Sequence, residues 1–229
     1  MNSRTMLTYL ILLGALLSGG CAGHTTGPTE EQQLVDNSTQ AFERFLDNPD
    51  VRNWYHAQWK NVKAVLIVPQ LLRGAFVVGG GGGRAVLLAR DFVRGGWSPP
   101  AFYTLGVGSF GVQAGADASE LILIVQSFSA LKRFQGSGTM KLGIDAGLTV
   151  GTMGEGGAFG YDIITFTSSK GAFIGMSLTG LSVTASNRSN EAYYEKPVET
   201  EEILSNASVT NPGADRLRAT VGRIIPPGR

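Results

Sequence analysis

Five consecutive glycines, Gly79 to Gly83, lie between two apolar runs and could form a loop that holds phosphate. A P-loop needs Lys and then Ser or Thr directly after its last glycine, because the Lys reaches the phosphates and the hydroxyl binds Mg²⁺. Here Arg84 and Ala85 follow, so both groups are missing. The dinucleotide fingerprint needs a glycine at the position of Arg84. We therefore interpret the run as a permissive hairpin turn followed by a strand, and we expect no cofactor.

Residues suited to hydrolysis are sparse. Ser109 lies in the sequence GVGSFG, but a nucleophile elbow needs glycine two positions before the serine and here that residue is Val107. His24 and His56 are the only histidines, and neither has a neighbour at the spacing of a metal site. We expect no metal and no enzymatic activity. A hydrolase would need a deep polar pocket around Ser109 or His56.

The N-terminal residues are typical of an export signal. Arg4 precedes the apolar stretch Met6 to Leu17, which has the length of a signal-peptide core. The only cysteine, Cys21, follows a run of small residues and resembles the lipidated cysteine of a bacterial lipobox, although Ser18 stands where Leu is usual. We predict a signal peptide over residues 1–20 and a lipidated tether over 21–28. An ordinary cleaved signal beside a free cysteine is the alternative.

Charge is balanced overall but segregated along the chain. The 19 basic and 18 acidic residues become 18 of each once the segment containing Arg4 is removed, so global charge does not favour nucleic acid as a partner. The segment from Val51 to Pro100, however, contains seven basic residues and a single acidic one, Asp91. A cationic face for anionic lipid headgroups is one interpretation, and ion pairing between neighbouring elements is the other. The candidate lipid-binding residues are Lys60, Lys63, Arg73, Arg84, Arg90, Arg94 and the neighbouring Trp59.

Apolar spacing predicts an amphipathic helix over Glu30 to Leu46, with Thr29 and Gln32 as a capping box, and a second helix from Pro49 to about Lys60. The acidic polar face of the first helix favours packing on a sheet. Short β-type runs divided by Gly or Pro then follow. They lie at 62–68, 75–78, 85–89, 101–110, 121–125, 140–150, 162–167, 172–178 and 181–185, with a hairpin turn at 168–172 and helical segments at 127–134 and 199–206.

Three blocks in order resemble the SYLF domain: AVLIVPQLLRGAFVVGGGGGRAVLLARD, GWSPPAFYTLGVGSFGVQAGADASELILIVQS and SSKGAFIGMSLTG. The resemblance covers about Lys60 to Ile203. It implies a domain that binds membrane lipids, phosphoinositides in eukaryotic members, with actin filaments as partners of some yeast members. Bacterial members are commonly exported lipoproteins. The family's lipid contacts are attributed to basic residues and an amphipathic segment near the start of the domain, which does not assign individual positions.

We accordingly predict an α+β fold: a curved, glycine-rich antiparallel sheet or partly closed barrel, with an N-terminal packing helix and short peripheral helices. Residues 29–60 form the helical segment, 61–206 the β-rich core and 207–229 a tail with a loosely attached helix. The expected function is non-enzymatic binding of membrane phospholipids by a bacterial lipoprotein. Ala22, where inner-membrane retention uses Asp, favours the outer membrane and its periplasmic face. The alternative is an envelope protein–protein interaction module that uses lipid only as an anchor.

Overall fold

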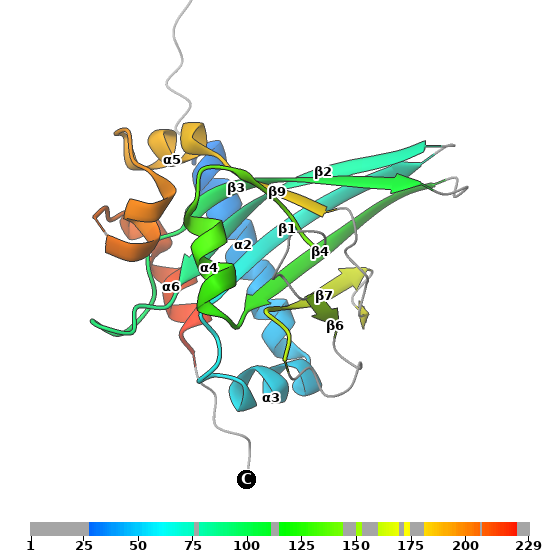
Figure 1. The fold of residues 1–229 in the computed structure, drawn as a ribbon, viewed down its shortest axis with the longest axis horizontal. Coiled ribbons are helices and arrows are strands. Elements are labelled where there is room, and N and C mark those ends of the chain that lie inside the picture. The colour runs from blue at the N-terminus through cyan, green and yellow to red at the C-terminus, as the bar shows by residue number, and fades with distance from the viewer. Residues whose placement is uncertain are drawn as a thin grey trace, which may run out of the picture.

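The computed structural model describes residues 28–75, 78–110, 115–143, 150–152, 160–169, 172–174, 181–206 and 208–223 (Figure 1). Within these ranges the first two elements are the helices α2 (Glu30–Asp47) and α3 (Pro49–Ala57). The Thr29 hydroxyl caps α2 by accepting the backbone N–H of Gln32 at 3.1 Å. The Gln32 side chain donates to Asp36 and to the Gly213 carbonyl, so only half of the predicted capping box forms. Both predicted helices are present.

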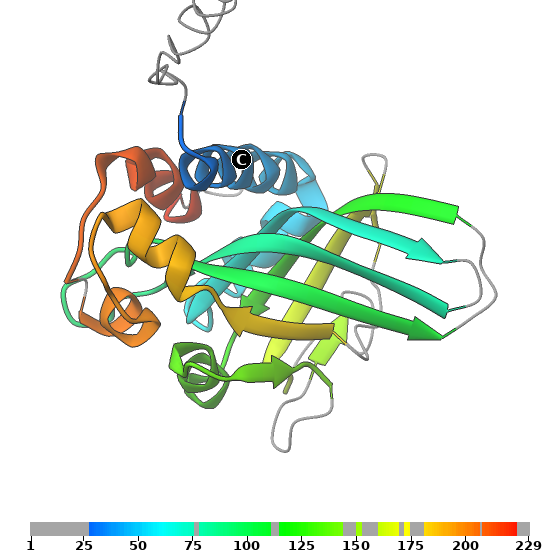
Figure 2. The ribbon, with the colours of Figure 1, turned by 90° about the horizontal axis from the view of Figure 1, so that it is seen from above.

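A curled sheet forms the body of the molecule (Figure 2). Its described strands are β1 (Ala64–Ala75), β2 (Val78–Ala89), β3 (Ala101–Phe110), β4 (Gly115–Val125), β5 (Thr139–Lys141), β6 (Val150–Thr152), β7 (Ile163–Ser169), β8 (Ala172–Ile174) and β9 (Leu181–Ala185). They are ordered β5-β9-β3-β2-β1-β4-β7-β6, and β8 also pairs with β7. The predicted curved sheet is confirmed, although β6 and β7 pair in parallel rather than antiparallel.

The core lies between α2 and the inner half of the sheet. Phe42 and Phe45 on α2 are fully buried, and the Phe45 ring meets Phe166 of β7 edge to face at 5.1 Å. Residues 64–68 of β1 are buried without interruption, which means that both faces of the central strand are covered at this end. The prediction that α2 packs on the sheet is therefore correct.

Short helices complete the domain: α4 (Phe128–Gln135), α5 (Asn187–Tyr194), the π-helical turn η2 (Glu202–Asn206), the 3₁₀ turn η3 (Pro212–Ala214) and α6 (Asp215–Val221). The prediction of a loosely attached C-terminal helix is wrong, because Leu217 and Val221 of α6 are fully buried. The Tyr55 hydroxyl donates to the Val221 carbonyl at 3.0 Å, and burial raises the pKa of Tyr55, which keeps the donor protonated. This helix belongs to the core.

The glycine run is not a turn. Gly79 to Gly83 form the first half of β2 and pair with β1 on one side and β3 on the other. A Cβ on Gly83 would lie 2.5 Å from the Gln70 carbonyl oxygen, and one on Gly82 would lie 2.7 Å from that of Leu105. Glycine is required here because neighbouring backbones approach too closely for a side chain. Residues 76–77, which connect β1 to β2, are outside the described residues.

A β-bulge divides β1 near Pro69. Its pairing advances three residues on β1 and two on β2, from Ile67↔Val86 to Gln70↔Arg84, and shifts by one residue against β4 at the same level. Proline has no N–H for the ladder, so a bulge accommodates it and bends the strand. Beyond this point the outer ends of β1 to β4 extend past the helices (Figure 1).

The other strand predictions mostly locate true strands with different lengths. The predicted strands at 101–110 and 181–185 match β3 and β9 as the structure has them. The predicted strand at 140–150 contains Met140 and Lys141 of β5 and the first residue of β6, with 144–149 outside the described residues. The predicted hairpin at 168–172 agrees with the Ser169↔Ala172 pair, while Lys170 and Gly171 themselves are not described.

The close strand approach predicts a difference between two glycines of the same run. Gly83→Ala should lower the free energy of unfolding by about 1–3 kcal/mol, because the added methyl overpacks against the Gln70 carbonyl. Gly80→Ala is the matched control, since its Cβ would meet only the Val107 oxygen at 3.7 Å. Urea denaturation followed by tryptophan fluorescence measures both. Equal stability losses would contradict the packing explanation.

Candidate functional site

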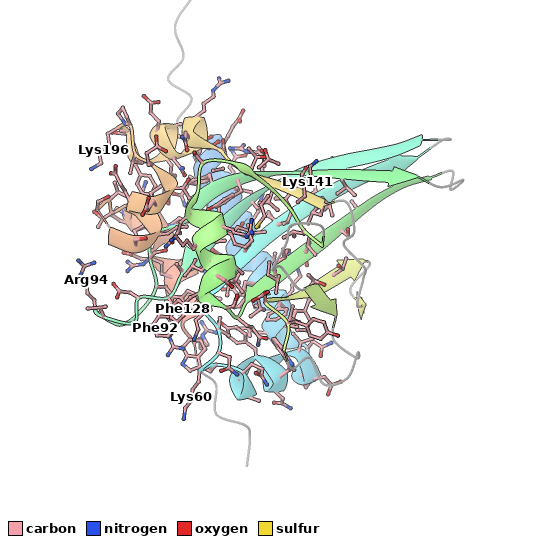
Figure 3. The ribbon with its side chains drawn as sticks, in the orientation of Figure 1. Lys60, Phe92, Arg94, Phe128, Lys141 and Lys196 are labelled. Carbon is pink, nitrogen blue, oxygen red and sulfur yellow. The ribbon has the colours of Figure 1, made fainter. Side chains whose placement is uncertain are left out.

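Three connections meet at the end of the sheet where β1 begins and β2 and β4 end. They are the turn after α3, the loop from Arg90 to Ser98 and the start of α4. Apolar side chains are exposed there: 47% of Phe92, 95% of Val93 and 60% of Phe128. We call this surface the aromatic–basic tip; it comprises Trp59, Lys60, Lys63, Arg90, Phe92, Val93, Arg94 and Phe128. Figure 3 shows Lys60, Phe92, Arg94 and Phe128 at this end of the molecule.

The loop that carries Phe92 and Val93 is held in one shape by Asp91. The carboxylate accepts the backbone N–H groups of Val93 at 2.9 Å and Arg94 at 2.8 Å, and these bonds hold its pKa below the ordinary value. The Asp91 backbone N–H also bonds to the Gly96 carbonyl at 3.0 Å. Gly95 and Gly96 have φ values of 81° and 84°, which suit glycine and close the turn. The exposed apolar residues therefore project from an ordered loop.

Lys63 lies between the two exposed phenyl rings. Its Nζ is 4.7 Å from the centroid of the Phe92 ring and 4.9 Å from that of Phe128, and the two rings pack edge to face at 5.5 Å. The same Nζ donates to the Lys60 carbonyl at 3.3 Å. Partial burial, and then the charge of Arg90, lower the pKa of Lys63. Within the described residues, Lys63 has no carboxylate close enough for an ion pair.

Arg90 connects the tip to the core. Its Nη1 donates to the Trp59 carbonyl at 2.7 Å, and its guanidinium carbon lies 4.7 Å from the Trp59 ring centroid and 5.1 Å from that of Phe92. Trp59 in turn packs against Tyr55 and Trp97, with centroids 5.7 and 5.9 Å away. Trp59 is thus a half-buried support for Arg90, whereas Phe92, Val93 and Phe128 form the exposed apolar surface.

The structure gathers five of the seven candidate residues at the tip: Trp59, Lys60, Lys63, Arg90 and Arg94. Arg84 lies elsewhere, beside α2, where it pairs with Glu31 at 2.8 Å and Glu30 at 3.3 Å. Arg73 is in the outer half of β1, opposite Gly81 and Asp117, and its side chain is outside the described part. The predicted cationic face therefore has to exclude Arg84, whose charge is paired.

Sequence reasoning missed Phe92, Val93 and Phe128. A signal for the first two exists, because Phe92-Val93 is an apolar pair inside a loop bounded by Asp91 and the Gly95-Gly96 pair. Phe128 lies within a correctly predicted helix, where an aromatic residue ordinarily indicates the buried face. Only the meeting of the loop with α4 places these side chains together.

A groove beside α2 is less suited to an anionic ligand. Two adjoining hollows of about 440 and 670 Å³ share Asn37, Pro69 and Gln70 in their linings. The arginines that line them are already paired, Arg44 with Glu120 and Arg84 with Glu31. An incoming anion would have to compete with these carboxylates. At the tip, Lys60, Lys63 and Arg90 have no carboxylate partner among the described residues, whereas Arg94 pairs with Asp91 at 3.7 Å.

Ser109 and His56, the residues considered for catalysis, belong to different elements. The backbone of Ser109 lies in β3 opposite Gly79, and His56 is on α3, where burial and then Arg52 lower its pKa. The Ser109 side chain and His24 are outside the described part. Among the described residues there is no cluster of three His, Cys, Asp or Glu that could hold a metal ion. The absence of enzymatic activity stays a prediction.

No helix in the described ranges has the length and apolar character needed to cross a bilayer. Cys21 and the predicted signal peptide precede the first described residue, Pro28.

Comparison with known proteins gives the chain's relatives. A sequence profile of the family described as "Ysc84: Las17-binding protein actin regulator" matches residues 106–224. Protein YSC84 of Saccharomyces cerevisiae is 26% identical over 168 residues, which are 69% of this chain and 35% of that protein. SH3 domain-containing YSC84-like protein 1 of Rattus norvegicus is 30% identical over 146 residues, 61% of this chain and 42% of that protein.

The chain thus spans well under half the length of these relatives. The profile match runs from β3 to α6, which extends past the predicted boundary at residue 206 and includes Phe128, but it begins after the basic part of the tip. The matched residues make up more than half of the chain, and the predicted resemblance is confirmed at the level of the family: the chain belongs to the Ysc84 family.

Proposed function

We propose that the aromatic–basic tip binds the anionic surface of a phospholipid membrane without carrying out chemistry. The observation that carries this proposal is the position of Lys63, whose ammonium group lies between two exposed phenyl rings. A membrane interface offers phosphate to the cation and acyl chains to the rings at adjacent depths. Few other surfaces place phosphate groups and hydrocarbon chains within reach of neighbouring side chains.

Electrostatics supply one part of the binding free energy. Each Lys or Arg close to an anionic bilayer contributes about 1 kcal/mol, and Asp91 pairs with Arg94, so Lys60, Lys63 and Arg90 together contribute at most about 3 kcal/mol. That sum alone corresponds to a dissociation constant of about 6 mM. Lys63 and Arg90 carry like charges that repel each other, and this repulsion adds to burial, the larger cause, in lowering the pKa of Lys63. A phosphate between them relieves this repulsion and favours the charged form of Lys63.

The apolar residues supply the other part. Fully burying a Phe or Val side chain contributes about 1.5–3 kcal/mol, so inserting Phe92, Val93 and Phe128 moves the affinity into the micromolar range. Asp91 holds the loop in place before binding, which reduces the conformational entropy lost on insertion. Neither the charges nor the rings suffice alone, and the tip presents both.

We also propose that Cys21 is acylated and anchors the chain to the outer membrane of a bacterial cell, facing the periplasm. Support comes from the single cysteine after the apolar segment and from Ala22 after it. The lipid anchor and the basic–apolar tip are then two separate membrane contacts of one chain.

A protein partner is the second candidate. The family description and one relative are named for binding a protein: LAS seventeen-binding protein 3 of Saccharomyces cerevisiae is 26% identical over 69% of this chain. The exposed tip could bind an acidic protein surface in the same way that it would bind headgroups. Vesicles without protein distinguish the two functions, because only a lipid-binding tip attaches to them.

The first prediction concerns the tip's charge. Lys60→Glu/Lys63→Glu should weaken binding to phosphatidylglycerol vesicles at least tenfold, since two attractive charges become repulsive. Lys141→Glu/Lys196→Glu changes the net charge equally at positions far from the tip (Figure 3) and should retain most of the binding. Co-sedimentation of residues 22–229 across a salt series measures this. The lipid proposal fails if unmodified protein does not sediment or both double variants lose binding equally, and the protein-partner candidate then takes precedence.

A second prediction separates loop order from charge. Asp91→Ala and Asp91→Asn remove the same negative charge, but only Asn keeps a side-chain oxygen for the N–H groups of Val93 and Arg94. Electrostatics alone predicts tighter binding by both variants. We expect Asp91→Asn to bind as well as the unmodified protein or better, and Asp91→Ala to bind about threefold more weakly, in the same vesicle assay. Tighter binding by both would show that loop order is irrelevant.

The anchor has its own test. Cells grown with an alkyne-labelled palmitate should incorporate the label into the full chain, and Cys21→Ser should abolish incorporation while leaving Lys141→Glu labelled as before. A labelled Cys21→Ser chain, or an unlabelled parent, rules out acylation at Cys21.

A further inference from the structure

The predicted tether joins the domain at the start of α2, whereas Lys60 of the tip lies at the opposite end of the domain and Arg94 at a level between the two (Figure 3). Pro28 enters α2 beside α5, where the Tyr193 hydroxyl donates to Gln32 at 3.3 Å. α2 then runs down the molecule, and α3 and its following turn lead to Lys60 at the other end (Figures 1 and 3). At 1.5 Å per residue, the 18-residue helix α2 alone is about 27 Å long.

The tether is short against this separation. Seven peptide units join Cys21 to Pro28. A chain of that length reaches at most about 25 Å when fully extended, and a flexible one averages about 15 Å. A lipid at Cys21 therefore cannot hold its bilayer against the tip unless the segment is stretched to its limit alongside the whole domain, which is entropically unfavourable.

In the remaining arrangement, the domain lies on its side against the bilayer that holds its anchor. The charge at the tether end opposes this arrangement. At the tether end, Glu30 and Glu31 in the first turn of α2 share Arg84, and in and after α5 the exposed Glu191, Glu195 and Glu199 outnumber Arg188 and Lys196. An anionic surface repels this excess of acid at close range. At the average reach of the tether the repulsion is screened, because the Debye length is about 8 Å at physiological ionic strength.

We infer that the chain anchored through Cys21 presents the aromatic–basic tip to a second anionic membrane and so bridges two bilayers. This inference rests on the proposed function, since it needs both the anchor and a lipid-binding tip. The chemistry of the tip fits this occupant: Lys60, Lys63 and Arg90 lie beside the three exposed apolar side chains of Phe92, Val93 and Phe128. The anchor and the tip contact two different bilayers, so their binding free energies do not add on a single bilayer.

The single cysteine allows a direct test. Residues 21–229, which retain every described residue, are coupled through the Cys21 thiol to maleimide lipid in phosphatidylcholine donor vesicles. These are mixed with phosphatidylglycerol acceptor vesicles, and energy transfer between dyes on the two populations reports bridging. We expect vesicles to cluster, Lys60→Glu/Lys63→Glu to reduce clustering at least tenfold, and Lys141→Glu/Lys196→Glu to retain it. Decorated vesicles mixed only with one another should stay dispersed; clustering among them would indicate self-association and overturn the inference.

Tether length provides the decisive variant. With phosphatidylglycerol also in the donor vesicles, twenty Gly/Ser residues inserted between Gly27 and Pro28 should let the tip reach its own bilayer and reduce bridging several-fold. Equal bridging by the long and natural tethers would contradict the geometric argument. Binding of residues 22–229 to vesicles without bridging by the anchored chain overturns this inference alone, whereas absence of both overturns the proposed function as well.

Discussion

The backbone of Lys63 fixes the geometry on which the tip depends. Its N–H donates to the Val125 carbonyl at the end of β4 at 2.7 Å, and its own carbonyl accepts the N–H of Arg90 at the end of β2 at 2.8 Å. Lys63 thereby joins three connections at the head of the central strand. Because the next five residues are fully buried, this junction is held by the best-packed part of the core. The tip is accordingly an extension of the sheet.

The sequence predicted those elements whose formation depends on residues close to one another in the chain. The α2 helix follows from its apolar spacing and its Thr29 cap, and β3 and β9 follow from short apolar runs between glycines or polar turns. The glycine run was misread because the reason for it is non-local: the backbones of Gln70 and Leu105 approach from two other strands. α6 was misjudged for the same reason, since Tyr55 and Val221 are 166 residues apart.

The candidate site was predicted in part because charge is visible in a sequence and position is not. Arg84 and Arg90 lie on the same strand path, six residues apart, which is about 20 Å along a β-strand. One pairs with Glu31 beside α2, and the other lies over Trp59 at the tip. Membership of the Ysc84 family does not separate them, since the matched residues begin at Gly106. Arg84 and Arg90 are distinguished by where β2 ends, and the register of the sheet determines that position.

The extra residue in β1 has a consequence for how sequences of this fold can vary in length. Leu71 is fully buried whereas Leu72 is half exposed, and this alternation holds only with one surplus residue near Pro69. Deleting a single residue there would exchange the faces of the whole outer half of the strand. Because the surplus is counted against both β2 and β4, no single change in a neighbouring strand compensates. Natural variation in chain length should therefore be concentrated in the connections and avoid this strand.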